Sequence, residues 1–213
     1  MPRTYRHWTP RYLWNRINEK LYRRTHPDLP WLTPEANDLL ATWLKPDYIG
    51  AEFGSGGSTV WLARHLAHLT SVEHNPTWYQ KVTGLLKETG LTNVEYYLKE
   101  KQPGDDAEGF NSNYVAIIDT FEDDSLDFVL VDGIYRSACV LALLDKIKPC
   151  GLLVIDNANI HLPCRSYSPN SRTPEMGPAT PAWGEFLKKV ESWQTHWTSN
   201  GVSDTAFFYK PAR

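Results

Sequence analysis

The chain has 213 residues and a mass of 24.4 kDa, which is the size of one domain or of one domain with a short appended arm. Hydrophobic residues make up 41% and charged residues 22% of the sequence, which excludes a disordered, collagen-like or disulfide-dense protein. The formal net charge of −3 is too small to indicate a polyanionic or polycationic partner for the chain as a whole.

The composition also indicates a compartment. No stretch approaches the roughly 20 apolar residues that span a bilayer, and the opening MPRTYRHWTP lacks the apolar core of a secretory signal. We therefore expect a cytoplasmic protein. Cys139, Cys150 and Cys164 contain no CxxC pair, so we expect reduced thiols rather than disulfides or a cysteine-based zinc site.

The N-terminal part differs in charge from the rest. Residues 1–25 contain seven Arg or Lys and one acid, Glu19, so they carry +6 and the remainder carries −9. Apolar residues at Leu13, Ile17 and Leu21 predict a basic amphipathic helix from residue 10 to residue 24. We expect this helix to pack on its own domain as a lid or docking helix, and peripheral contact with an anionic membrane is the alternative.

A proline-rich linker follows, and a second helix is predicted up to about Leu44, so we divide the chain into an arm with its linker (1–45) and a main domain (46–213). In the main domain, apolar runs alternate with stretches of helical spacing. The predicted strands are 48–53, 69–74, 94–98, 126–132 and 151–157, and the predicted helices are 58–68, 76–88, 114–121, 136–148 and 183–193.

This order predicts an α/β fold. Strand–helix alternation gives a doubly wound, mostly parallel sheet, because parallel crossovers are long and right-handed. The segments THWT and TAFFYK, joined by the turn residues SNGVSD, predict an antiparallel hairpin that completes a seven-stranded sheet at one edge. Residues 161–182 predict a long lid or binding loop, in which Arg165, Tyr167 and Arg172 are available to an acceptor.

In such sheets ligands bind at the carboxyl ends of the strands. The first strand ends in the run Glu52-Phe53-Gly54-Ser55-Gly56-Gly57-Ser58-Thr59, whose glycines allow a tight turn and close approach to a ligand. Glu73 ends the second strand 21 residues after Glu52, at the offset where an acid accepts hydrogen bonds from ribose hydroxyls. The glycine turn and Glu73 together indicate a nucleotide-like ligand.

Two residues bear on the kind of nucleotide. Thr59 stands where a pyrophosphate-binding turn needs its third glycine, and Glu52 would repel a pyrophosphate. An acid at this place suits a ligand with a cationic amino acid part. A Rossmann-type NAD-dependent oxidoreductase or epimerase is nevertheless kept as the first alternative.

These residues resemble the motifs of the class I S-adenosylmethionine-dependent methyltransferases. The matching segments are AEFGSGGST from residue 51, SVEH with Glu73, LDFVLVDG with Asp132, KPCGLLVIDN with Asp156, and the final hairpin. The resemblance extends from Tyr48 to Lys210 and implies a seven-stranded Rossmann-like fold of the O-methyltransferase type, with S-adenosylmethionine as the cofactor.

The resemblance also implies roles for single residues. The expected cofactor-binding residues are Gly54, Ser55 and Gly56 at the methionine part, Ser58 and Thr59 at the start of the helix, Glu73 and His74 at the ribose, and Glu52 and Asp132 at the ammonium and sulfonium end. The candidate bases are Asp132, Asp156 and His161. Asp132, Asp156 and Asn157 also resemble a Mg²⁺ ligand set, but we do not favour Mg²⁺, because Asp156 and Asn157 also suit a loop held by side chain-to-backbone hydrogen bonds.

We therefore predict methyl transfer to a small-molecule or glycan-like acceptor, with oxygen favoured over nitrogen. Methyl transfer needs an acceptor held in line with an already activated methyl group. A methyltransferase-like binding module without turnover is a further alternative. A nucleic-acid acceptor is disfavoured, because the main body is acidic and no DPPY-like tetrapeptide follows the fourth strand. The oligomeric state is left open.

Overall fold

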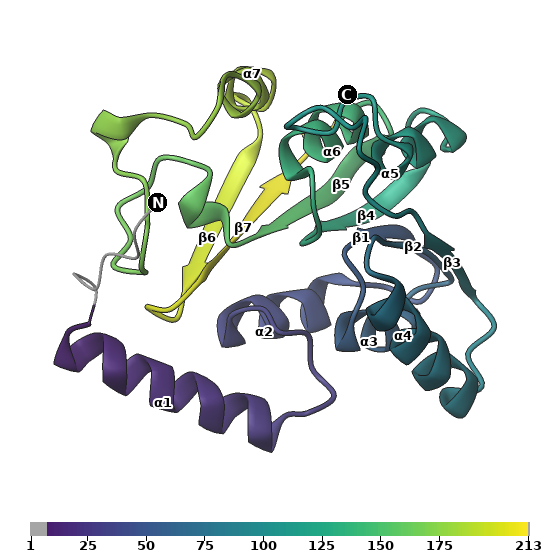
Figure 1. Ribbon diagram of the computed structural model, residues 1–213, viewed down its shortest axis with the longest axis horizontal. Coiled ribbons are helices and arrows are strands. Elements are labelled where there is room, and N and C mark those ends of the chain that lie inside the picture. The colour runs from purple at the N-terminus through teal and green to yellow at the C-terminus, as the bar shows by residue number, and fades with distance from the viewer. Residues whose placement is uncertain (1–7, 213) are drawn as a thin grey trace.

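The computed structural model describes residues 8–212, in which a central sheet carries helices on both faces (Figure 1). The first seven residues, which include Arg3 and Arg6 of the predicted basic arm, lie outside the described part of the chain. Within residues 8–212, no helix is long and apolar enough to cross a membrane.

The sheet has seven strands. They are β1 (Ile49–Phe53), β2 (His68–Glu73), β3 (Val94–Leu98), β4 (Leu126–Val131), β5 (Ile147–Asp156), β6 (Gln194–Ser199) and β7 (Asp204–Tyr209). Their order is β3-β2-β1-β4-β5-β7-β6. The first five are parallel, whereas β7 is antiparallel to both β5 and β6. The predicted fold class, including the antiparallel edge hairpin, is confirmed.

Helices cover the two faces of the sheet. The helices α2 (Pro34–Trp43), α3 (Gly57–Ala63) and α4 (Pro76–Thr89) lie on one face, and α5 (Asn113–Ala116), α6 (Arg136–Leu143) and α7 (Pro181–Lys189) lie on the other (Figure 1). Successive side chains of a strand point to opposite faces, so Val129 and Val131 of β4 pack in one apolar cluster, and Phe128 and Leu130 pack in the other. This two-sided burial explains the unbroken apolar runs of the central strands.

The arm helix α1 (Pro10–Thr25) forms as predicted, with the Thr9 side chain accepting a hydrogen bond from the Tyr12 amide at its start. The polar side of α1 contacts the rest of the chain. Asn15 packs so closely on Gly201 of the β6–β7 turn that a Cβ at Gly201 would lie 2.1 Å from Asn15 Nδ2. Glu19 is buried on this side and forms ion pairs with Arg16 and Arg23. The apolar stripe of α1 is exposed.

The predicted helix 136–148 is wrong at its C-terminal end. α6 ends at Leu143, and β5 begins at Ile147 and contains Pro149. The pairing of β5 with β4 shifts after Ile147 and resumes at Leu152, and Cys150 has a φ of +65°. Pro149 is tolerated in β5 because it lies in this irregular, bulged segment. Proline has no N–H, and at a bulge no ladder hydrogen bond is lost for lack of it.

The predicted helix 58–68 also extends too far. α3 ends at Ala63, because the side-chain amide of Asn93 donates to the carbonyl oxygens of Ala63 and Leu66 at 2.8 and 2.9 Å. These hydrogen bonds satisfy the carbonyls that a longer helix would have used. The remaining predicted elements are found where expected, with ends shifted by a few residues.

Candidate functional site

The turn after β1 lies between the ends of β2 and β4. The Gly54 amide donates to the Val72 carbonyl at 2.9 Å, and the Asp132 amide donates to the Phe53 carbonyl at 2.8 Å. Gly54 has a φ of +101°, and a Cβ at this position would lie 2.4 Å from the Gly133 nitrogen. Glycine is therefore required here both by its backbone conformation and by the approach of the β4 exit.

Glu52 anchors this turn from behind. Its carboxylate is fully buried and accepts hydrogen bonds from Ser58, Thr59 and Ser71 at 2.5, 2.6 and 2.8 Å. Burial raises the pKa of Glu52 to about 7, although the three hydrogen bonds oppose the shift. The same carboxylate thus joins β1, the start of α3 and β2.

Glu52 makes stability depend on pH. Because its folded-state pKa lies above the ordinary value of 4.5, the folded state binds the proton more tightly, and stability falls as pH rises through the window from 4.5 to about 7. Asp156, whose pKa is also raised to about 7, acts in the same direction. We expect Glu52→Gln to weaken the decline in melting temperature between about pH 5 and pH 8, as measured by thermal unfolding. An unchanged decline in this variant would contradict the assignment.

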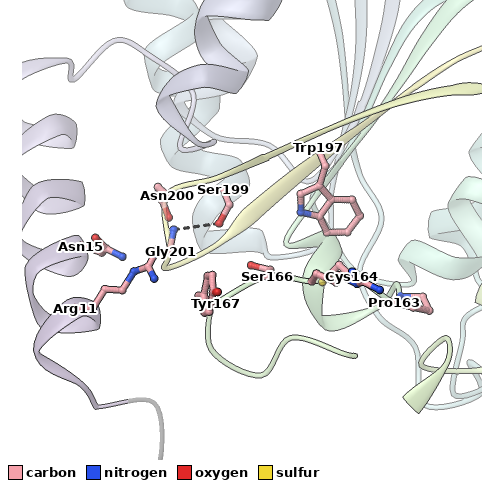
Figure 2. A pocket seen from close by; sticks show the side chains of 11 residues that line it. Arg11, Asn15, Pro163, Cys164, Ser166, Tyr167, Trp197, Ser199, Asn200 and Gly201 are labelled. Carbon is pink, nitrogen blue, oxygen red and sulfur yellow. Dashed lines mark hydrogen bonds between the residues drawn. The ribbon is translucent and has the colours of Figure 1, made fainter. Parts of the chain in front are cut away.

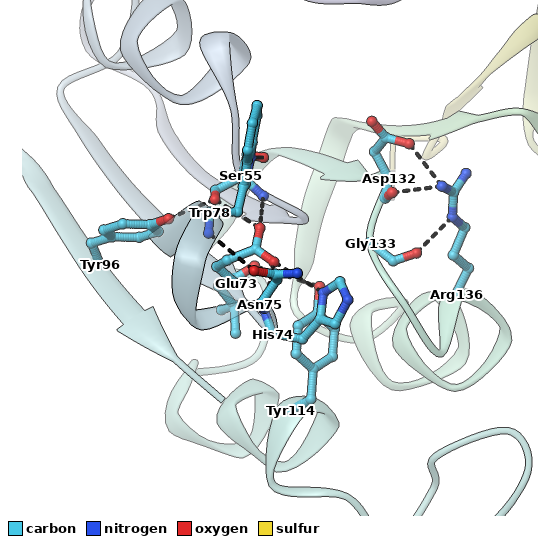
Figure 3. Close-up of polar contacts among 11 residues, drawn as sticks. Ser55, Glu73, His74, Asn75, Trp78, Tyr96, Tyr114, Asp132, Gly133 and Arg136 are labelled. Atoms are coloured by element: carbon cyan, nitrogen blue, oxygen red, sulfur yellow. Dashed lines mark hydrogen bonds and ion pairs between the residues drawn. The ribbon is translucent and has the colours of Figure 1, made fainter. Parts of the chain in front are cut away.

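Glu73 points toward the turn (Figure 3). Its Oε2 accepts hydrogen bonds from the Ser55 amide at 3.1 Å and from the Ser55 hydroxyl at 2.8 Å. Its Oε1 accepts from the amides of His74 and Asn75, both at 2.8 Å, and lies 3.0 Å from His74 Nδ1. Burial by itself would raise the pKa of Glu73, but the hydrogen bonds from His74, Asn75 and Ser55 outweigh it and lower the pKa to about 2. The carboxylate is therefore ionised at neutral pH.

Two aromatic residues that sequence reasoning did not assign complete the surroundings of Ser55. The Trp78 ring nitrogen donates to the Ser55 carbonyl at 2.6 Å, and the hydroxyls of Ser55 and Tyr96 are 2.6 Å apart. The ammonium of Lys81 lies 4.3 Å from the centroid of the Trp78 ring. The sequence offers one clue to these residues, which is their place beside the turn: Trp78 follows β2 and Tyr96 lies on β3.

Two cavities meet at the turn, since both are lined by Ser55, Trp78 and Asp132. The first has a volume of about 580 Å³ and is also lined by Gly54, Glu73, His74, Asn75 and Thr77. The second has a volume of about 230 Å³ and is also lined by Gly56, Ser58, Lys81 and Trp31 of the α1–α2 linker. The structure thus gathers the predicted cofactor residues around one turn, except that Glu52 and Thr59 are buried behind it.

Arg136 joins the ends of β4 and β5, and sequence reasoning missed it. Its guanidinium donates to Asp132 Oδ1 at 2.8 Å, to Asn157 Oδ1 at 3.3 Å, and to the carbonyl oxygens of Asp132, Gly133 and Asp156. This cation lies between the side chains of Asp132 and Asn157, where the oxygen ligands of a Mg²⁺ ion would have to converge. In the part of the chain that the structure describes, no group of three or more His, Cys, Asp or Glu is placed to hold a metal ion.

The other two candidate bases lie farther along the sheet. Asp156 is buried and accepts a hydrogen bond from the Thr205 hydroxyl at 2.7 Å, and burial, followed by the charge of Asp132, raises its pKa to about 7. His161 stacks on Trp183 with ring centroids 4.9 Å apart, and burial, followed by the charge of Arg136, lowers its pKa to about 4. His161 also lines a cavity of about 260 Å³, together with Gly133, Tyr135, Arg136 and Thr180.

In the loop 161–182, the side chain of Arg172 is not available to an acceptor as predicted. Arg172 donates to the carbonyl oxygens of Gly177 and Met176 at 2.6 and 3.0 Å, so its guanidinium holds the loop itself. Tyr167 is 78% exposed and lies beneath Arg11, 4.4 Å from its guanidinium carbon. Residues 163–167 line a separate cavity of about 610 Å³ between α1 and the β6–β7 turn (Figure 2).

Comparison with known proteins agrees with this architecture. No protein-family model matches the sequence, and no curated protein matches it. Among solved structures, an rRNA methylase from Streptococcus thermophilus is similar with a TM-score of 0.56 at 14% identity, covering 83% of this chain and 95% of that one. A SAM-dependent O-methyltransferase from Thermotoga maritima is similar with a TM-score of 0.54 at 14% identity, covering 85% and 67%.

A SAM-dependent methyltransferase from Aquifex aeolicus is similar with a TM-score of 0.51 at 13% identity, covering 92% of this chain and 97% of that one. At such identities the likeness concerns the fold. The chain has the fold of the class I SAM-dependent methyltransferases, as its motifs indicated.

Proposed function

We propose that this chain binds S-adenosylmethionine at the turn after β1 and transfers its methyl group to a hydroxyl of a small-molecule or glycan-like acceptor. The observation that carries the proposal is the position of Glu73. It is an ionised carboxylate at the end of β2, directed at Ser55 of the glycine turn and bordering a cavity of about 580 Å³.

The charges around the turn fit this cofactor. Glu73 and Asp132 border the cavities, so the site favours a ligand that brings a positive charge and a sugar diol. Lys81 borders the second cavity, where it can pair with the carboxylate of an amino acid part. A pyrophosphate at the same turn would instead meet the carboxylate of Asp132, which is the physical argument against a nicotinamide dinucleotide.

The hydroxyls of Ser55 and Tyr96 allow a ribose to replace Ser55 as the hydrogen-bond partner of Glu73. In the described structure the Ser55 hydroxyl occupies one of the acceptor positions on Glu73 Oε2. The Tyr96 hydroxyl lies 2.6 Å from the Ser55 hydroxyl. Ser55 therefore keeps a hydrogen-bond partner when a ribose hydroxyl replaces it at Glu73. We therefore assign Glu73 to the ribose, with His74 beside it, and Gly54, Ser55, Gly56 and Ser58 to the methionine part.

S-adenosylmethionine supplies a methyl group already activated on a sulfonium. The residues of the chain would bind the cofactor, orient the acceptor and remove the proton of the acceptor hydroxyl. Asp132, held by Arg136, faces the positive end of the cofactor, while Glu52 and Thr59 hold the turn in shape from behind. The acceptor hydroxyl is proposed to lie in the cavity next to Gly133, where His161 would take the proton of the hydroxyl. The acceptor oxygen would form its bond to the methyl carbon as the carbon–sulfur bond breaks, and S-adenosylhomocysteine would leave. Asp156 is assigned a positioning role through Arg136 and Thr205.

Replacing His161 tests the base. With a pKa of about 4, the imidazole is neutral at physiological pH, so the rate of the natural chain should fall only as pH drops through about 4. We expect His161→Asn to lower kcat about 100-fold and to remove this acidic limb, while the affinity for S-adenosylhomocysteine stays unchanged. An unaltered pH profile of kcat in the variant would remove His161 from the mechanism.

The proposed function is tested by an acceptor screen with methyl-labelled S-adenosylmethionine and a panel of hydroxylated small molecules and oligosaccharides. Label transferred to oxygen, and lost with Glu73→Ala, is the expected result. Binding of the cofactor without any labelled product would instead indicate a binding module without turnover. Label recovered on RNA alone would contradict the proposed acceptor class.

A further inference from the structure

The apolar face of α1 points away from the rest of the molecule. Leu13, Trp14, Ile17 and Leu21 are between 44% and 65% exposed, and at helical spacing they form one stripe along α1. On the opposite side, Glu19 is only 6% exposed and Asn15 packs against the β6–β7 turn. Figure 1 shows α1 at the border of the molecule, with the other elements on one side of it.

The charge of this surface has a single sign. Arg11, Arg16, Lys20 and Arg24 are exposed on α1. The one acid of the helix, Glu19, is buried between Arg16 and Arg23, at 2.6 Å from each. Lys20 and Arg24 follow Ile17 and Leu21 by three residues, so they flank the apolar stripe. An occupant of this face must therefore be apolar and must bring negative charge.

We propose that α1 is a docking helix for the surface of an anionic lipid bilayer. The helix lies in the plane of the interface, with Trp14, Ile17 and Leu21 in the boundary between headgroups and acyl chains and with Lys20 and Arg24 at the lipid phosphates. Its 16 residues correspond to a length of about 24 Å, which suits an in-plane helix. This inference does not depend on the proposed function.

The charges argue against other occupants. A symmetric dimer formed through α1 would bring the basic residues of one α1 against those of the other. The seven residues before Trp8 carry Arg3 and Arg6 and no acid, so they would repel this surface as well. RNA matches the charge but gains nothing from the aliphatic side chains of Leu13, Ile17 and Leu21. An anionic bilayer satisfies both properties of the face.

Co-sedimentation of the full chain with vesicles tests the proposal. We expect binding to vesicles of phosphatidylglycerol and phosphatidylcholine in about equal amounts, and little binding to phosphatidylcholine alone. Ile17→Glu/Leu21→Glu should lower the partition coefficient at least about tenfold, and Lys20→Glu/Arg24→Glu should lower it to a similar extent. All four positions are on the exposed side of α1, so the variants should keep the fold, which circular dichroism checks.

A matched control separates this surface from general hydrophobicity. Phe110, in a turn, and Met176, at the end of a short 3-10 helix, are 53% and 56% exposed outside α1. Phe110→Glu/Met176→Glu therefore makes the same charge change elsewhere, and this variant should bind as the natural chain does. The proposal is overturned if the natural chain stays in the supernatant. It is also overturned if only the charge variant loses binding, which indicates a general polyanion site, or if the natural chain is a dimer that Ile17→Glu/Leu21→Glu converts to a monomer.

Discussion

Replacing Glu73 with alanine is expected to weaken the binding of S-adenosylhomocysteine about 100-fold, because a ribose diol loses two hydrogen bonds to an ionised acceptor. The variant also leaves the amides of Ser55, His74 and Asn75 without their carboxylate. We therefore expect a lower melting temperature as well, and binding should be measured calorimetrically at a temperature where the variant is folded.

Two variants separate the loss of a ligand contact from the loss of local structure. Glu73→Gln keeps the shape of the side chain and one acceptor oxygen, so it should fold better than Glu73→Ala and still bind weakly. Glu95→Ala removes a glutamate from the neighbouring strand β3, where the side chain is 57% exposed, and should change neither property. Full affinity in both Glu73 variants would show that the ligand does not contact this carboxylate.

Gly54→Ala is expected to cause the largest loss of stability among these substitutions, about 3 kcal/mol or more. The φ of +101° is strained for alanine, and the added Cβ would lie 2.4 Å from the Gly133 nitrogen and 2.6 Å from its Cα. Both neighbours are backbone atoms, so the clash can be relieved only by separating the turn from the end of β4. Denaturant unfolding measures the loss, and ligand binding should be lost with it.

Gly57→Ala is the matched control. A Cβ at Gly57, three residues along the same turn, meets nothing within 4 Å. Because Gly57 begins α3, alanine there should be neutral or slightly stabilising. Equal stability of the two variants would contradict the close approach between the turn and the end of β4.

Much of the fold could be predicted because buried positions are mostly occupied by apolar residues, whose spacing can be read in the sequence. The central strands β4 and β5 are apolar on both faces, and the glycine turn follows the predicted strand β1, while Glu73 ends the predicted strand β2. The end of α6 could not be predicted, because Pro149 is read locally as a helix stop and its place in a bulge of β5 depends on pairing with β4. Likewise, the end of α3 depends on Asn93, which is distant in sequence.

The sequence indicated only some of the residues that the structure places around the candidate site. Motif residues such as Gly54 and Glu73 carry a recognisable spacing, whereas Arg136, Trp78 and Tyr96 act through contacts with distant backbone and hydroxyl groups. The orientation of α1 was also unexpected. An amphipathic pattern predicts a helix and its apolar stripe, but it does not show whether that stripe faces the protein or solvent.

The central claim is that the glycine turn and Glu73 bind a sulfonium nucleoside. Isothermal titration calorimetry of the full chain with S-adenosylhomocysteine, and separately with NAD⁺, tests it most directly. We expect one S-adenosylhomocysteine to bind per chain, with no heat of binding for NAD⁺. Binding of NAD⁺ by the folded chain in the absence of binding of S-adenosylhomocysteine would contradict the account.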